Sequence, residues 1–117
     1  DRVVFCGFVS DDDLLDLYAR ALAVVYPPYD EDYGYITVES FLSGKPVITC
    51  NDSGGVLEFV RHEHNGLVCE PEPEAIGEAI GRLWSKPRWG VELGEAGLET
   101  VAHIHWDTVV ERFRQFL

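Results

Sequence analysis

The sequence predicts an α/β fold in which helices flank a mostly parallel sheet, and three observations lead to this prediction. Short, unbroken apolar runs recur along the chain, as expected of strands that are buried on both faces. Segments with helical spacing lie between these runs, and helical crossovers join parallel strands. The chain shows no internal repeat, linker or low-complexity tract. We therefore expect a single domain over residues 1–117.

The predicted strands are the four apolar runs at residues 3–6, 22–26, 46–50 and 67–69. Ser10 is a suitable N-cap for a helix that follows the first strand, and Gly44 with Pro46 ends the next helix. The predicted helices cover residues 11–21, 35–43, 54–60, 74–84, 89–101 and 106–117. The last is amphipathic, and its apolar stripe is either core or a docking surface for another domain.

Charge and composition exclude several classes of function. The chain carries 21 acidic and nine basic residues, which gives a net charge of −12. Nucleic-acid binding requires clustered Lys and Arg, so no nucleic-acid partner is expected. The same excess of acid repels an anionic ligand unless backbone dipoles or another protein segment compensate for it.

The cysteines, the histidines and the hydropathy predict the redox compartment, the absence of a metal site and the cellular location of the chain. Cys6, Cys50 and Cys69 lie at or near the ends of apolar runs, which predicts free core thiols in a reducing compartment. The H-x-H pairs at 62–64 and 103–105 lack a complete ligand set, so no metal site is predicted. No apolar run is long enough to span a bilayer and no leader pattern opens the chain, so a cytoplasmic location is expected.

Three loops are candidate ligand sites, because ligands bind at the carboxyl ends of parallel strands. These loops cover residues 7–9, 27–34 and 51–55, and the first begins with Gly7. In the third, Ser53 precedes the pair Gly54-Gly55 at a helix start, where bare backbone N–H groups suit a phosphate or a sugar hydroxyl. Such residues also serve simply to turn the chain and cap helices, so this alternative stays open.

Glu39 lies at the border of the apolar face of the predicted helix 35–43. An unpaired buried carboxylate is costly, so we expect a partner for it. Its geometry suits the two hydroxyls of a ribose. The alternatives are that Glu39 reaches solvent or pairs with Lys45.

These residues form a pattern that resembles a known family. The stretch PPYDEDYGYITVESFLSGKPVITCNDSGGVLEFV, followed by NGLVCEPEPEAIGEAI, is similar to the nucleotide-sugar-binding domain of retaining GT-B glycosyltransferases of family four, the "group 1" family. Its most specific element is Glu31 and Glu39 with seven residues between them. The likeness extends over essentially the whole chain and implies the C-terminal part of a Rossmann-like donor-binding domain.

The resemblance implies roles for individual residues. Glu31, the implied catalytic residue, would lie beside the donor sugar and bind its hydroxyls, while Glu39 would accept the ribose hydroxyls. Backbone N–H groups around Tyr33, Gly34, Tyr35 and Ile36 would receive the sugar or the diphosphate. The implied reaction transfers a sugar from a nucleoside diphosphate with retention, and without a metal or other cofactor.

The same resemblance implies that parts of the family's enzyme are absent from residues 1–117. Members carry a basic Arg and Lys pair near the start of this domain and a whole N-terminal acceptor domain. We therefore expect a partial domain that is inactive alone, with self-association or segment exchange through an incomplete sheet. Peripheral membrane association through the missing part stays open.

Two other classes of protein remain alternatives. A receiver-like, non-catalytic module would use the acidic cluster to chelate a divalent cation, and a structural assembly domain would bind no small molecule. A receiver-like module does not account for the Glu31 to Glu39 spacing together with Gly54-Gly55.

Overall fold

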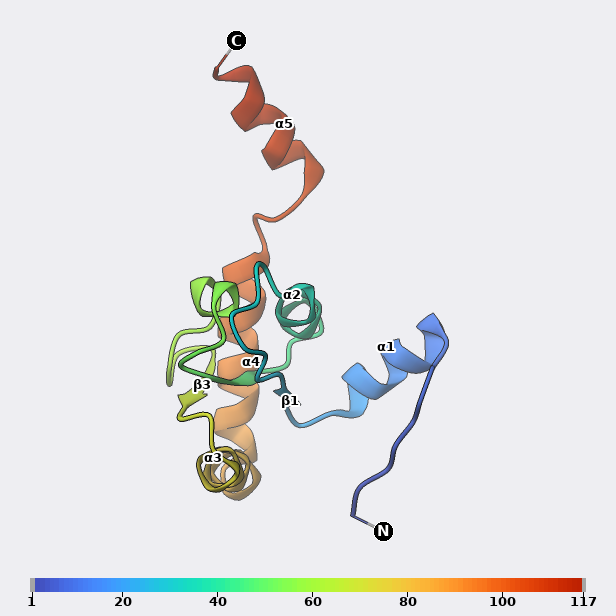
Figure 1. Cartoon of the computed structure of the whole chain (residues 1–117). Coiled ribbons are helices and arrows are strands. Elements are labelled where there is room, and N and C mark those ends of the chain that lie inside the picture. Colours follow the sequence, from blue (N-terminus) through green and yellow to red (C-terminus); the bar gives the residue numbers. More distant parts are fainter. Residues whose placement is uncertain (1, 117) are drawn as a thin grey trace.

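The computed structural model describes residues 2–116, and it consists of a small sheet with helices around it (Figure 1). Its elements are α1 (Asp11–Arg20), β1 (Val24–Val25), α2 (Tyr35–Leu42), β2 (Val47–Cys50), the 3₁₀ turn η1 (Gly55–Glu58), β3 (Gly66–Cys69), α3 (Pro73–Ser85), α4 (Pro87–Val101) and α5 (Trp106–Arg114).

The three strands form a parallel sheet in the order β1-β2-β3. Val24 is paired with Val47, and Ile48 is paired with Leu67. All four residues of the central strand β2 are buried, which explains its unbroken apolar run. The prediction of a parallel α/β sheet with flanking helices is confirmed.

Alternating side chains of β2 divide the core into two clusters. Val47 packs in the cluster that contains Phe41 of α2, and Ile48 packs in the cluster that contains Leu83 of α3. Because successive side chains of a strand point to opposite faces, α2 and α3 cover opposite faces of the sheet, as Figure 1 shows. Each face is therefore closed by a helix.

Helix α4 packs against the end of the sheet where β2 begins. A Cβ on Gly94 would collide with the backbone of Gly44, which lies just before β2, and a Cβ on Gly97 would collide with the ring of Phe41. Only glycine permits so close an approach. The carboxyl ends of the strands lie at the opposite end of the sheet, away from this contact.

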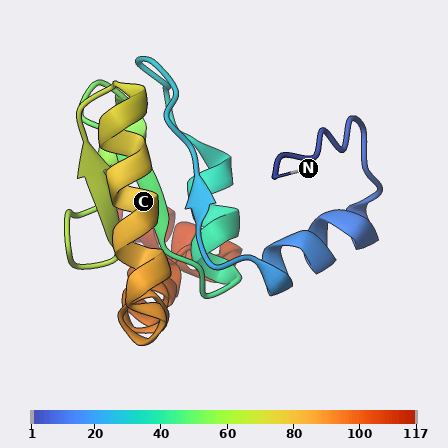
Figure 2. The same cartoon turned by 90° about the horizontal axis from the view of Figure 1, so that it is seen from below.

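The N-terminal segment differs from the prediction. Residues 3–6 form no strand, and their side chains are exposed, including that of Cys6, whereas Cys50 is buried as predicted. A strand needs a neighbour for its backbone hydrogen bonds, and no strand lies beside this segment in the part of the chain that is described. Figure 2 shows the segment and α1 on one side of the body, apart from the sheet.

Two further helices are shorter than predicted. The third helix is only the four-residue turn η1, and the last ends at Arg114, while Leu117 lies outside the described residues. Helix α5 extends away from the sheet (Figure 1), with Phe113 and Phe116 exposed, so the core interpretation of its stripe is wrong. Its role as a docking surface stays a prediction.

Candidate donor-binding site

A cavity of about 500 Å³ opens where the loop after β1 leads into α2. Its volume lies in the range of small-molecule sites. The residues that line it are Tyr26, Glu31, Asp32, Tyr33, Gly34, Tyr35 and Ile36. The structure thus brings five of the predicted site residues together, and Tyr26 and Asp32 join them.

Glu31 is half-buried in this cavity and is held by side-chain and backbone contacts. The phenol of Tyr26 donates to its Oε2 at 3.0 Å, and the Asp32 N–H donates to its Oε1 at 3.0 Å. Its own N–H donates to the carbonyl of Ser53 at 3.1 Å, in a parallel bridge with Gly54. Hydrogen bonds to its side chain and to its backbone therefore fix the position of the carboxylate.

The pair Gly54-Gly55 brings two loops into contact. The Gly55 N–H donates to the carbonyl of Glu31 at 2.6 Å, so it is already occupied. Gly54 has a φ of 70°, and a Cβ there would lie 2.7 Å from the Glu31 carbonyl oxygen. The expectation of bare N–H groups is wrong for Gly55, and the four-residue η1 is too short to act as a helix dipole. The pair therefore packs against the backbone of Glu31 and holds it in place.

Ser53 likewise turns inward. It is fully buried, and its Oγ accepts from the Cys50 N–H at 3.2 Å and from the Thr49 hydroxyl at 2.8 Å. The hydroxyl stabilises the turn after β2, and it does not line the cavity. A direct contact of this side chain with a ligand is thus not favoured by the geometry.

The first turn of α2 presents donors to the cavity. Gly34 caps the helix in the left-handed conformation, with φ 81°, and no side chain caps the helix start. The Thr37 N–H donates to Gly34 O at 3.0 Å, whereas the Tyr35 and Ile36 N–H groups have no acceptor within residues 2–116. Unpaired N–H groups at a helix start attract anions and hydroxyls.

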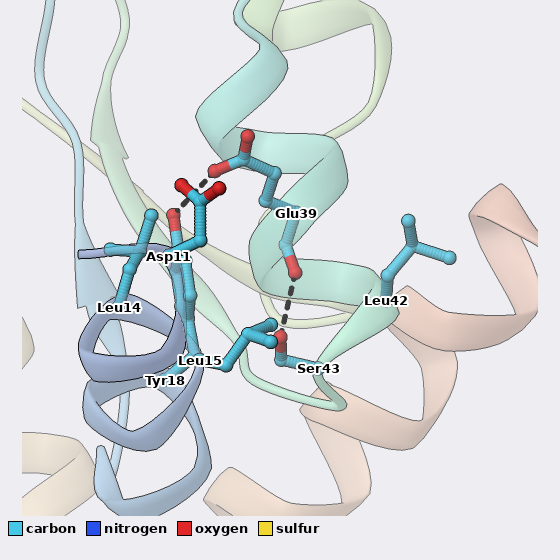
Figure 3. Close-up of a pocket in the computed structure, with 7 residues that line it drawn as sticks. All are labelled: Asp11, Leu14, Leu15, Tyr18, Glu39, Leu42 and Ser43. Atoms are coloured by element: carbon cyan, nitrogen blue, oxygen red, sulfur yellow. Dashed lines mark hydrogen bonds between the residues drawn. The ribbon is translucent and has the colours of Figure 1, made fainter.

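Glu39 lies one turn further along α2, in a groove of about 380 Å³ between α1 and α2 (Figure 3). Its side chain is exposed, so the expectation of a half-buried carboxylate is wrong. Its partner is Tyr18, whose phenol donates to Oε2 at 2.9 Å, and no ion pair with Lys45 forms in the described chain. The other oxygen, Oε1, accepts no hydrogen bond from residues 2–116.

Gly7 lies apart from both the cavity at Glu31 and the groove at Glu39. It sits in the exposed N-terminal segment with a φ of 62°, and a Cβ there would meet no atom within 4 Å. It lines neither the cavity at Glu31 nor the groove at Glu39. The structure therefore does not bring Gly7 to the other predicted site residues.

The tyrosine that donates to each of the two glutamates has a raised pKa. Burial, then the hydrogen bond and negative charge of Glu39, raise the pKa of Tyr18 to about 12. Burial and the neighbouring Glu31 likewise raise the pKa of Tyr26. Sequence reasoning missed both pairs. The signal for Tyr18 was its place on the apolar stripe of α1, which turns it toward the next helix.

The described residues show neither a metal cluster nor a membrane-spanning helix. Within residues 2–116, no group of three or more His, Cys, Asp or Glu side chains is arranged to hold a metal ion. No helix in the same range has the length and apolar character needed to cross a membrane.

Comparison with known proteins identifies relatives of the chain. It is 32% identical to an uncharacterised glycosyltransferase of Methanocaldococcus jannaschii over 114 residues, which are 94% of this chain and 28% of that protein. It is 35% identical to the alpha-1,3/1,6-mannosyltransferase ALG2 of Mus musculus over 101 residues, which are 86% of this chain and 24% of that protein.

A solved structure with the same fold is the sucrose-phosphate synthase of Thermosynechococcus elongatus. The TM-score is 0.86 at 32% identity, over 98% of this chain and 29% of that one. Anabaena HepE in complex with UDP-glucose gives a TM-score of 0.83 at 25% identity, over 99% of this chain and 32% of HepE. The predicted fold is confirmed, because these neighbours are GT-B glycosyltransferases.

The chain spans between 24% and 32% of the length of these four proteins. The family model described as glycosyl transferases group 1 matches residues 1–100, and on this evidence the chain belongs to that family.

Proposed function

We propose that the chain is the donor-binding part of a retaining glycosyltransferase, which moves a sugar from a nucleoside diphosphate to an acceptor. One observation carries this proposal: Glu31 and the unpaired N–H groups of Tyr35 and Ile36 line the same cavity. A carboxylate suits the hydroxyls of a sugar, and a helix start suits the adjoining diphosphate. Retention of configuration and independence from metal follow from the family resemblance.

Helix α2 supplies the positive potential for the departing diphosphate. Stabilisation of the charge that develops on the leaving group is commonly the largest catalytic contribution. No Lys or Arg lines the cavity, and the chain has a net charge of −12. We therefore propose that further cations, and the acceptor site, come from segments outside residues 1–117. The chain spans only 24% to 32% of the length of its relatives, which supports the proposal that other segments supply these parts. Turnover by the chain alone is not expected.

Glu39 is the proposed ligand of the ribose. Tyr35 and Glu39 are four residues apart, so they lie on the same face of α2, separated by a rise of about 6 Å. Oε2 of Glu39 accepts one hydrogen bond from Tyr18 and Oε1 accepts none from residues 2–116, so both oxygens keep a site for a ribose hydroxyl. One nucleotide sugar can therefore contact the helix start with its phosphates and Glu39 with its ribose.

The relatives favour a hexose donor. HepE has been crystallised with UDP-glucose, and ALG2 is named a mannosyltransferase. These names belong to those proteins, and they guide the choice of probes for this one. UDP-glucose and GDP-mannose together sample both bases and both sugars.

Calorimetric titration of the 117-residue chain with these two compounds, in the presence of EDTA, tests the proposal. We expect at least one of them to bind, and Glu39→Ala to weaken that binding. In a separate titration with Mg²⁺ and without EDTA, tight Mg²⁺ binding by a chain that has no affinity for a nucleotide would instead support a receiver-like module. The absence of any binding would support a structural role and would contradict the proposal.

A further inference from the structure

We infer that Tyr26 is a positioning residue for Glu31: its phenol holds the carboxylate in the orientation in which the donor sugar is bound. This inference rests on the proposed function, and it assigns to Tyr26 a role in recognising the sugar and not the nucleotide.

The hydrogen bonds of Glu31 leave room for a ligand. Oε2 accepts from the Tyr26 phenol and Oε1 accepts from the Asp32 N–H, each at 3.0 Å. A carboxylate can accept about four hydrogen bonds, so each oxygen keeps a site for a sugar hydroxyl. Together the two donors fix the plane of the carboxylate, which decides where those remaining sites point.

Tyr26 is itself firmly held. Its N–H donates to the carbonyl of Ile48 at 2.9 Å, which extends the pairing of β1 with β2. Its ring packs against the core cluster that contains Phe41 and Val47. Gly34 lies beside the ring: a Cβ there would make an ordinary contact of 3.5 Å with Tyr26 Cε1, whereas it would collide with the Val56 side chain at 2.8 Å. The phenol is thus anchored to the sheet, and Glu31 is aligned relative to the sheet through it.

The hydrogen bond also bridges residues 27–30, the loop that connects β1 to the residues lining the cavity. Tyr26 and Glu31 stand at the two ends of residues 27–30, and both line the cavity. Asp30 in this loop has a φ of 46°, a conformation that few residues other than glycine adopt. Pairing across the loop keeps Glu31 in place although the residues between are mostly exposed.

A purely structural role makes a different prediction. A half-buried tyrosine often binds any nearby acceptor to satisfy its hydroxyl. In that case Tyr26→Phe would lower the stability of the fold and would affect all ligands alike. A positioning role predicts a selective loss for ligands that carry the sugar.

The test compares UDP with UDP-glucose, and GDP with GDP-mannose, by calorimetry on the 117-residue chain. Tyr26→Phe should weaken binding of the nucleotide sugar about tenfold and leave binding of the nucleoside diphosphate unchanged. Tyr29→Phe is the matched control, because Tyr29 is 83% exposed and its phenol makes no hydrogen bond with the described residues. Equal weakening of both ligand types, or of neither, would overturn the inference.

A double mutant shows whether Tyr26 acts through Glu31. In a Glu31→Ala background, which removes the acceptor of the Tyr26 phenol, Tyr26→Phe should cause no further loss of affinity for the nucleotide sugar. A further tenfold loss would mean that Tyr26 acts by another route. If wild-type chain binds none of the four probes, the proposed function fails and the inference fails with it, whereas binding without sugar selectivity in Tyr26→Phe overturns the inference alone.

One measurement requires no ligand. NMR relaxation of the Glu31 side-chain methylenes should show restricted motion in wild-type chain and increased motion in Tyr26→Phe, with far-UV circular dichroism unchanged. Equal order in the two proteins would also contradict the inference.

Discussion

Tyr18 of α1 donates a hydrogen bond of 2.9 Å to Oε2 of Glu39 on α2. Helix α1 contains no fully buried residue, so this bond is a specific link between the N-terminal helix and the body of the protein. The link also fixes one oxygen of the carboxylate that we propose for ribose binding. The position of α1 and the geometry of the donor site are therefore connected.

The Tyr18 to Glu39 pair predicts a loss of stability at high pH. The pKa of Tyr18 is about 12 in the folded protein and is taken as 10 when unfolded. The folded state therefore binds more protons between these values, and its stability falls as the pH rises from about 10 to about 12. Denaturant titrations over this range should show a weaker pH dependence for Tyr18→Phe than for Tyr29→Phe. An identical pH dependence in the two variants would contradict the assigned pKa.

Gly54 is expected to be irreplaceable, although it lies outside any helix or strand. Its φ of 70° and the nearby Glu31 backbone both exclude a Cβ, so Gly54→Ala should lower the free energy of unfolding by about 1–3 kcal/mol. Gly77 in α3 is the control, since a Cβ there meets nothing within 4 Å. Gly77→Ala should raise stability by about 0.5–1 kcal/mol. Chemical denaturation measures the free energy of unfolding of both variants. Equal changes in the two variants would be inconsistent with the close contact of Gly54 with the Glu31 backbone.

Asn65 joins the loop before β3 to helix α4. It is fully buried, accepts from the Arg61 N–H at 2.8 Å, and donates to Phe59 O and to Thr100 Oγ1. Asn65→Ala leaves buried groups unpaired and should cost about 2–3 kcal/mol. Asn51→Ala, at an exposed position, should cost less than about 0.5 kcal/mol. Urea unfolding measures the stability of both variants. A loss of stability in Asn65→Ala as small as that in Asn51→Ala would show that water replaces the hydrogen-bond partners of Asn65.

The N-terminal segment predicts self-association. Phe5 is 94% exposed and Phe8 is fully exposed, and large apolar side chains gathered on one segment favour contacts with another molecule. Light scattering should show a mass that rises with concentration, and the double change Phe5→Ser and Phe8→Ser should reduce that rise. A monomer at every concentration would refute this expectation.

Elements that carry their own sequence signal, such as a buried apolar strand or a helix that begins with proline, could be predicted. Elements that form only when another part of the chain lies beside them could not. Strand β2 was predicted because three of its four residues, Val47, Ile48 and Cys50, are apolar, and in the structure all four residues are buried. Helices α3 and α4 both begin with proline, which suits a first helical position. The run 3–6 has equal apolar character, yet it forms no strand because it lies apart from the sheet and pairs with neither of the edge strands β1 and β3.

The site shows the same division. The spacing of Glu31, Gly34 and Glu39 was readable, and it led to the correct family. The burial of Glu39 was wrongly predicted, because a helical pattern does not reveal whether a neighbouring helix packs closely or leaves a groove. The hydrogen bond of the Gly55 N–H was also not predicted, since the close approach of two loops has no local sequence signal.

The contact of Glu39 with the ribose is tested most directly by comparing UDP with 2′,3′-dideoxy-UDP, or the corresponding guanosine pair if GDP binds better. In wild-type chain, loss of both hydroxyls should weaken binding tenfold or more, because hydrogen bonds to a charged group contribute about 1.5–3 kcal/mol. In Glu39→Ala, the difference between the two nucleotides should largely disappear. An equal difference in both proteins would show that Glu39 does not bind the ribose and would contradict the proposed donor site.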